Sequence, residues 1–399
     1  MTMLKSINLR LPLKKGRFAG FFLLGLLSAC QPVAPDPEQQ LITAAKTNVT
    51  AAEQLAKQRL AANELDAALH WWRHAATLGS EAALEHAVRL QLRLEGKLAT
   101  AHWLDSVKHS VPGQVSEPLL AELGFWHSTV AQQHKGWQSE AGCALLLQPV
   151  IAQAQGERTW QNLLQAWQQD SQLATLPVCF KPLLRLDSIA LNCTEQPGQR
   201  IRCDYQTLAP QVLSGEFQQL LVIAGRGLAS YNNGIVQLPD DASLALLRHE
   251  FMHIAGFLDE YVLSPTVAKA VCKAGRIAPN LLIGDDENTL ARYLHRYQLT
   301  AAEIQLTAVD TCNAVGLQAY RPIAAINPMR HFEADLPLLY EQLLQQAFQQ
   351  PQRLMPVQYY FAYLARQEQS WQNWQRYMQG AAAFGYPAAI SALAVAVEG

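Results

Sequence analysis

Apolar residues are distributed differently in the first and second halves of this chain. Alanine, leucine and glutamine dominate residues 41–180, and because all three favour helices, this part is predicted to be helical throughout. Later apolar runs are short and end at glycine or proline, which is typical of strands. Residues 220–225 predict a buried strand that stops at Gly225. Residues 234–239 predict a short strand that Pro239 confines to a sheet edge.

A helix is predicted directly after these strands. Asp240, Asp241 and Ser243 supply N-cap chemistry ahead of the helix-forming run of residues 244–248. Gly256 stands where a glycine in the left-handed conformation would end such a helix.

Upstream of these elements, residues 188–193 and 200–205 predict a hairpin around the Pro197-Gly198 pair, a turn signal. Strands followed by a helix and then by a helical lower half indicate the α+β fold class.

The predicted helix carries the pattern H-E-x-x-H, formed by His249, Glu250 and His253. Positions i and i+4 lie above one another on one helical face, so both imidazoles can bind one zinc ion. Glu250 lies one residue further round, where it can hold and deprotonate a metal-bound water. The alternative is an amphipathic helix with ordinary polar histidines, but that explains neither the glycine nor the acid that follows.

A third metal ligand is expected shortly after this pattern. The turn at Gly256 lets the chain double back and direct Asp259 toward the ion. Glu260 is the next candidate, and Glu287, at the start of a helix predicted around residues 289–297, is a third. We favour Asp259 because Gly256 supplies the necessary turn. Three protein ligands leave one position open for water, which is typical of a catalytic zinc.

The run of His249, Glu250, His253 and the following glycine resembles the metzincin metallopeptidase signature, H-E-x-x-H-x-x-G-x-x-H. Asp259 stands in place of the third histidine, a replacement similar to that in snapalysin-type members. The D-E-Y run that Asp259 begins is similar to one in immunoglobulin-A-peptidase-like members. The resemblance implies a zincin-like catalytic domain in residues 181–350, with a small mixed sheet, an active-site helix and Zn²⁺ as cofactor.

The same resemblance implies a methionine turn beneath the metal. Met329, which follows an Asn-Pro pair, is the candidate for its buried thioether. Tyr261, Tyr320, Arg330 and His331 are candidates to help the metal stabilise the oxyanion, and the sequence does not rank them.

Small residues recur at a fixed spacing in two distant segments. Residues 67–82 contain the spacing A-A-x-x-G-x-x-A, which returns in residues 381–388. This spacing resembles Sel1-like and tetratricopeptide repeats, in which small residues let paired helices approach closely. We therefore predict a Sel1/TPR-like helical domain in residues 41–180, with related helices in residues 351–399 packing onto it. Alanine-rich helical hairpins of no particular family are the alternative. Such a module would present a protein substrate or bind a protein partner.

The N-terminal segment predicts export. Residues 1–30 combine a basic start, an apolar run over residues 18–27 too short to span a bilayer, and the tetrad Leu-Ser-Ala-Cys. The tetrad resembles a bacterial lipobox, which implies that Cys30 becomes the acylated first residue of the mature protein. Gln31 after it favours the outer membrane, facing the periplasm or the cell surface. Residues 31–40, with several prolines, predict a short stiff tether.

An even number of cysteines remains once Cys30 is assigned to the lipid, and in an exported protein this predicts disulfides. Spacing alone does not settle the connectivity. The favoured pairs are Cys193 with Cys203 across the hairpin, Cys272 with Cys312 in the catalytic domain, and Cys143 with Cys179 in the helical region.

Charge and composition narrow the function further. The chain has a formal net charge of −2 and no basic run outside the signal segment, so nucleic-acid binding is not expected. The favoured function is a lipid-anchored zinc endopeptidase acting on envelope or extracellular proteins. One alternative is a non-catalytic interaction scaffold, against which the intact Glu250 argues. The other is a zinc amide hydrolase acting on peptidoglycan, which a cleft without a free edge strand would favour.

Overall fold

The computed structural model of this chain describes residues 36–126, 142–284 and 286–398. The predicted signal segment, Cys30 and residues 31–35 of the predicted tether lie outside the described residues. The prediction of a tether is wrong for residues 37–40, which form the start of helix α1 (Pro37–Ala45). Within them the chain is a mixture of helices and a small mixed sheet, which confirms the α+β class. None of the described helices is both long enough and apolar enough to cross a bilayer.

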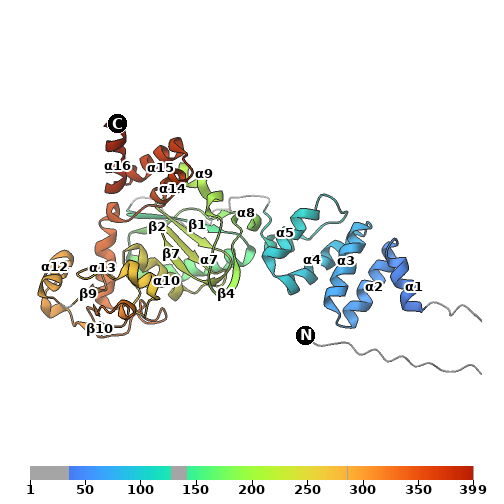
Figure 1. The fold of residues 1–399 in the computed structure, drawn as a ribbon, viewed down its shortest axis with the longest axis horizontal. Helices are drawn as coiled ribbons and strands as arrows, with labels where there is room; N and C mark the ends of the chain where they lie inside the picture. Colours follow the sequence, from blue (N-terminus) through green and yellow to red (C-terminus); the bar gives the residue numbers. More distant parts are fainter. Residues whose placement is uncertain (1–35, 127–141, 285, 399) are drawn as a thin grey trace, which may run out of the picture.

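The first helices extend away from the sheet as an arm, called here the helical arm (Figure 1). Consecutive helices pack against one another, and alanines such as Ala68, Ala75 and Ala87 are completely buried between them. This agrees with close helix approach through small residues. The helices of the arm are α1 (Pro37–Ala45), α2 (Val49–Ala61), α3 (Leu65–Thr77), α4 (Glu81–Glu95), α5 (Lys97–Val107) and α6 (Glu117–Leu123).

A six-stranded sheet forms the centre of the molecule, in the order β2-β1-β5-β8-β7, with β3 also paired to β1. The pairs along the sheet are parallel except for β7, which lies antiparallel to β8 at one edge. The strands are β1 (Leu145–Ile151), β2 (Val178–Phe180), β3 (Leu184–Arg185), β5 (Gln219–Ile223), β7 (Ser230–Asn232) and β8 (Ile235–Leu238).

The prediction that residues 41–180 are helical throughout is wrong at its C-terminal end. Residues 145–151 and 178–180 form β1 and β2 of the sheet, with α7 (Ala154–Gln169) and the short 3-10 helix η1 (Leu173–Thr175) between them. Strand β1 has three successive leucines, and a short apolar run of this kind is predicted equally well as a strand or as part of a helix. The sheet therefore begins well before residue 181.

Two further strand predictions have different outcomes. The strand predicted at residues 220–225 is β5, which spans residues 219–223, so the buried strand is confirmed although it ends two residues before Gly225. Residues 234–239 contain β8, but its predicted position at the sheet edge is wrong, because β8 lies between β5 and β7. Pro239 follows the strand rather than lying in it, and therefore places no limit on its neighbours.

The predicted hairpin over residues 188–205 is also wrong. The segment forms the short helix α8 (Ser188–Leu191), strand β4 (Glu195–Arg200) and η2 (Tyr205–Leu208). Strand β4 contains the Pro-Gly pair and lies parallel to β6 (Arg226–Leu228).

Helices cover both faces of the sheet. On one face lie α7, α10 (Leu244–Ile254) and α13 (Leu338–Phe348). On the other lie α9 (Ala209–Ser214), α14 (Val357–Gln367) and α15 (Trp371–Ala383), followed by α16 (Pro387–Glu398). The C-terminal helices therefore pack on the sheet and not on the helical arm as predicted, as Figure 1 shows.

A smaller unit follows α10 and has its own core around Cys272 and Cys312. The three predicted cysteine pairs are confirmed, and they indicate an oxidising compartment. Cys143–Cys179, however, joins the segment before β1 to β2 instead of lying in the helical region. The unit contains α11 (Pro265–Val271), β9 (Leu282–Ile283), α12 (Glu287–Tyr297), η3 (Ala301–Glu303), β10 (Thr307–Val309), η4 (Asn313–Val315) and β11 (Ala319–Arg321).

The helical arm is attached to the sheet through a buried ion pair. Lys97 Nζ lies 3.0 Å from Asp240 Oδ2, and both side chains are almost completely buried. The carboxylate of Glu195 accepts hydrogen bonds from the backbone of Lys97 and Leu98. This contact lies just ahead of α10, the helix that carries the histidines.

Candidate metal centre

Helix α10 forms as predicted, with local signals at both ends. The Ser243 hydroxyl accepts a hydrogen bond from the Leu246 amide at 3.2 Å and so caps the first turn. Leu247, Phe251 and Ile254 lie at helical spacing and pack into the core below the sheet. The opposite face of α10, which carries the histidines, therefore does not pack into this core.

The helix ends at Gly256, as its sequence predicts. Gly256 has φ +88°, and the Phe257 amide donates to the Met252 carbonyl at 3.3 Å across the turn. A Cβ at Gly256 would meet no atom closer than Pro279, at 3.9 Å, so the requirement for glycine is conformational rather than steric. The turn reverses the chain toward the two histidines.

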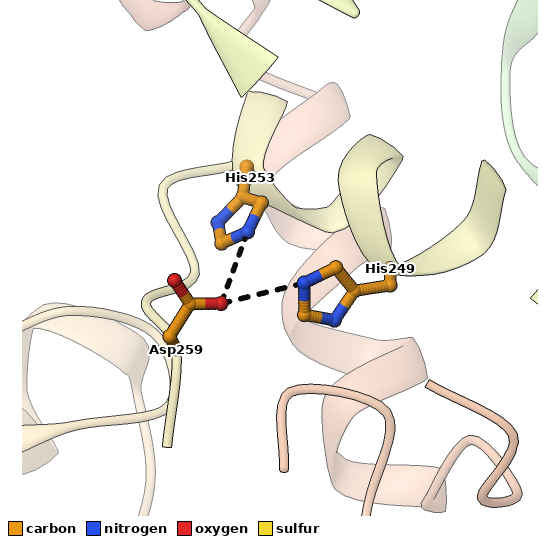
Figure 2. Close-up of side chains that lie close together, drawn as sticks. All are labelled: His249, His253 and Asp259. Atoms are coloured by element: carbon orange, nitrogen blue, oxygen red, sulfur yellow. Dashed lines mark ion pairs between the residues drawn. The ribbon is translucent and has the colours of Figure 1, made fainter. Parts of the chain in front are cut away.

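His249, His253 and Asp259 converge on one point (Figure 2). Asp259 Oδ1 lies 3.3 Å from His249 Nε2 and 3.4 Å from His253 Nε2. Two ligands of a tetrahedral zinc with bonds of about 2.1 Å are about 3.4 Å apart. The aspartate therefore lies at the separation from each imidazole that one such ion would require.

The hydrogen bonds of the two rings leave their Nε2 atoms free. Nδ1 of His249 lies 2.8 Å from the Pro328 carbonyl, and Nδ1 of His253 lies 2.8 Å from the Phe257 carbonyl. A carbonyl oxygen can only accept, so each Nδ1 carries a proton, and each ring in its neutral form directs its Nε2 lone pair at Asp259. Asp259 Oδ1 is itself buried without a hydrogen-bond partner. With both rings neutral, three electron-pair donors converge on one point, and this donor set fits a divalent metal.

Without a bound cation, the same three groups attract a proton. Burial alone would raise the pKa of Asp259, but the adjacent imidazoles outweigh it and hold that pKa far below its usual value. Burial would likewise lower the pKa of His253, but the Asp259 carboxylate outweighs it and raises that pKa. A bound cation would replace the proton that His253 otherwise attracts.

Glu250 lies beside the three residues, and all four side chains line one cleft, which is described below. Its side chain is buried, and burial raises its pKa, an effect that His253 and His249 only partly offset. A carboxylate with a raised pKa is suited to accept a proton and release it again at neutral pH.

The loop after Gly256 is fixed by Glu260, which the sequence offered as a second candidate ligand. The Glu260 side chain is completely buried and does not belong to the group of side chains that converges with the histidines. Its carboxylate accepts hydrogen bonds from Asn280 at 3.0 Å, Asn327 at 2.7 Å and Tyr340 at 2.6 Å. It is therefore not a ligand in this structure. We call these four residues the Glu260 cluster.

Glu287, the other candidate ligand, is the first residue of α12 and is exposed. Among the described residues it does not belong to the group that could share a metal with the histidines. Asp259 takes that place, as favoured from the sequence.

Met329 lies in a turn whose preceding residue, Pro328, contacts His249. The Asn327 side chain accepts a hydrogen bond from the Met329 amide at 2.9 Å, and the Met329 carbonyl accepts one from the Glu260 amide at 2.9 Å. The preceding Pro328 carbonyl is the partner of His249. Met329 itself is completely buried in the core with Phe251. The structure therefore shows that Met329 is buried, and its role in a methionine turn stays a prediction.

The histidines lie at the base of a cleft of about 370 Å³, and strand β7 forms one wall of it. β7 is the edge strand that the sequence analysis had placed at residues 234–239. Its residues Ser230, Tyr231 and Asn232 line the cleft, and in the described chain only β8 pairs with it. Its outer backbone edge can therefore pair with an extended peptide.

Of the four candidates for oxyanion stabilisation, only Tyr261 lines this cleft. Burial, together with the Asp259 carboxylate, raises its pKa, so its hydroxyl stays protonated as a donor. Arg330 and His331 line a different cavity, and Tyr320 lies in β11. Arg200 of β4, which the sequence analysis did not single out, also lines the cleft. No local motif marks it, because β4 reaches the cleft only through its pairing with β6.

Comparison with known proteins gives no match: no family model matches the chain, and neither does any curated protein sequence. The site is therefore interpreted from its own geometry.

Proposed function

We propose that this protein is a zinc-dependent endopeptidase. The observation that carries the proposal is the convergence of His249 Nε2, His253 Nε2 and Asp259 Oδ1 on one point, while the Nδ1 atom of each imidazole is held by a backbone carbonyl. Two further features support it, namely a buried acid with a raised pKa at Glu250 and a free edge strand beside the cleft. The antiparallel edge strand beside a helix with H-E-x-x-H is consistent with a zincin-like domain.

In this proposal His249, His253 and Asp259 hold Zn²⁺, which when bound supplies Lewis acidity toward water and the scissile carbonyl. Glu250 accepts the proton of the attacking water and passes it to the leaving amine. Strand β7 binds the substrate backbone in extended form. Tyr261 can donate its hydroxyl proton toward the developing oxyanion from the wall of the cleft.

The free edge strand favours peptide bonds over the amide linkages of peptidoglycan, because strand pairing recognises an extended polypeptide backbone. The helical arm resembles Sel1/TPR-like modules and would recruit a protein substrate or partner. Lipidation at Cys30 and attachment to the outer membrane remain part of the same proposal.

The test is to purify the protein, measure bound zinc, and follow cleavage of denatured casein and of peptidoglycan fragments. Glu250→Gln should retain zinc and lose about 10²–10⁴-fold in kcat, because the general base is removed. His253→Ala should lose both zinc and cleavage. His295→Ala, which removes an exposed histidine from α12, is the matched control and should change neither.

Cleavage that persists in Glu250→Gln, or zinc that stays bound in His253→Ala, would contradict the assignment. Turnover of peptidoglycan fragments without turnover of casein would favour the amide hydrolase instead. Zinc binding without any hydrolysis would favour the non-catalytic scaffold.

A further inference from the structure

A second cavity, of about 470 Å³, adjoins the cleft at the C-terminal end of α10. The two share Tyr231, Gly256 and Arg276 in their walls, so they form one continuous depression. Its volume lies within the range of small ligand sites and can accept a substrate side chain. We call it the arginine cavity.

Three arginines line this cavity from three separate segments. Arg276 follows α11, Arg296 lies in the last turn of α12, and Arg353 ends the 3-10 helix η5 (Pro351–Arg353). No carboxylate of the described residues lines the cavity with them. Positive charge therefore gathers here without acidic side chains to balance it.

The three guanidinium groups are also not paired with acids elsewhere in the described chain. Arg276 donates to the Val271 carbonyl at 2.6 Å, and Arg296 lies over the ring of Tyr297 at 5.6 Å from its centre. Neither of them, nor Arg353, forms an ion pair with any described residue. Most of their N–H donors face solvent and can bind an anionic ligand.

The partial negative charges of nearby helix C-termini do not cancel the positive charge of the three arginines. Helices α10, α12 and α13 all direct their C-terminal parts at the cavity. Each C-terminus carries about half an elementary negative charge, so the three together amount to about −1.5. Three arginines carry twice that charge with the opposite sign, and the cavity remains net positive.

The inner wall of the cavity is apolar. Leu343 and Ala347 of α13 and the following Leu354 and Met355 form it, with Tyr297 beside them. A side chain with an aliphatic stem and a terminal carboxylate matches this combination, because the stem contacts the apolar wall and the carboxylate reaches the arginines.

The edge strand β7 and the residue that follows it line both the cleft and the arginine cavity. Tyr231 lines both, Asn232 lines only the cleft, and Asn233 lines only the arginine cavity. A peptide that pairs with β7 across the histidines therefore continues into the arginine cavity. Alternate side chains of an extended peptide point to the same side, so one near the scissile bond enters it.

We propose that the arginine cavity binds an acidic side chain of the substrate close to the scissile bond, so that this protein cleaves acidic peptides preferentially. The inference rests on the proposed peptidase function and adds the substrate class to it.

The first test compares peptides that differ only by Glu, Gln or Lys at each position within three residues of the cleaved bond. One exposed ion pair is worth up to about fivefold, so contact with two arginines should raise kcat/KM for Glu over Gln by about tenfold at one position. Lys at that position should give the lowest value. Equal kcat/KM for Glu and Gln at every position would overturn the proposal.

The second test changes the cavity. Arg296→Glu and Arg353→Glu should each reverse the order, so that the ratio of kcat/KM for the Lys peptide over the Glu peptide rises above one. Arg366→Glu is the matched control, because Arg366 is an exposed arginine of α14 outside both cavities. It should keep the wild-type ratio. An unchanged ratio in folded Arg296→Glu and Arg353→Glu would overturn the proposal.

A binding measurement separates this inference from the peptidase function. Fluorescence anisotropy with Glu250→Gln should show tighter binding of the Glu peptide than of the Gln peptide, whether or not turnover occurs. Cleavage without any preference for Glu would overturn the cavity assignment and leave the peptidase proposal standing. Preferential binding of the Glu peptide without cleavage by the wild type would support the cavity assignment and overturn the peptidase proposal. Peptides with amidated C-termini should behave like the free acids, since a loss on amidation would show that the cavity binds the terminal carboxylate instead.

Discussion

In the helical arm, neighbouring helices contact one another through buried alanines, whereas the loop that carries Asp259 is held by hydrogen bonds. Ala68, Ala75 and Ala87 are completely buried in the arm. Around the metal centre the completely buried side chains include Glu260, Asn280 and Asn327. Apolar contacts tolerate exchange of one small group for another, but a buried carboxylate depends on each of its partners. The position of Asp259 is therefore specified more narrowly than the packing of the arm.

The largest effect is expected from breaking the Glu260 cluster. Glu260→Leu removes the carboxylate to which Asn280, Asn327 and Tyr340 donate. It also leaves Arg321 without its buried counter-charge, 3.5 Å away. The free energy of unfolding should fall by about 3–5 kcal/mol, and zinc binding should be lost. Urea unfolding and a zinc titration measure the two. Glu287→Leu, at an exposed acid, should change neither, and equal effects of both substitutions would contradict the role of the cluster.

Removing the metal should act on only one of the two regions. With zinc at a hundred times its dissociation constant, chelation should lower the free energy of unfolding by about 3 kcal/mol. Amide hydrogen exchange should accelerate around Asp259 and stay unchanged in the helical arm. Because the ligand histidines bind zinc only when neutral and the Asp259 carboxylate raises the pKa of His253, bound zinc should begin to decrease while the pH is still above about 6.5, the ordinary pKa of histidine. Faster exchange in the arm would contradict the separation.

Overpacking should disturb the arm without reaching the site. Ala87→Leu inserts a larger side chain between tightly packed helices and should lower the free energy of unfolding by about 1–3 kcal/mol. Zinc content and cleavage per folded molecule should stay at their wild-type values. Ala82→Leu, at an exposed position of the same helix α4, is the control and should be close to neutral. Loss of zinc in Ala87→Leu would show that the arm positions the ligands.

The smallest effect on stability should come from Gly256→Ala, and here zinc affinity is the sharper measurement. Alanine in the left-handed conformation costs about 1–2 kcal/mol, and a shift of the turn would move Asp259. Gly316→Ala is the matched control, since Gly316 has φ +70° with open space around it and lies outside both cavities. Both should lose similar stability, but only Gly256→Ala should weaken zinc binding. Equal zinc affinity in both would contradict the role of this turn.

The parts of the fold and site that the sequence predicted are those set by neighbours along the chain. Helix α10 has its cap, its apolar stripe and its terminal glycine within fourteen residues, Ser243 to Gly256, and these signals needed no tertiary information. Asp259 follows from the same turn. The predicted pairing of the cysteines also agreed with the structure. The prediction that Cys143–Cys179 lies in the helical region did not.

The errors concern elements whose state depends on distant segments. Strand β1 reads as a helix because its apolar residues are buried by helices on both faces of the sheet, which removes the alternation of a half-exposed strand. The edge position of β7 depends on how β8 pairs with β5. The sequence did not predict the role of Arg200 or the arginine cavity for the same reason, since the residues that line each of them come from segments far apart in the sequence. Only the assembled fold places them together.

The ion pair between Lys97 and Asp240 has a consequence for how substrates approach. Turning the helical arm about the sheet would separate two opposite charges in surroundings with little water, so the arm and the opening of the cleft keep one mutual orientation. Any surface or protein that holds the arm therefore also decides which way the cleft faces. The protein then discriminates between substrates by the direction from which a polypeptide arrives, before any side chain of that polypeptide is recognised.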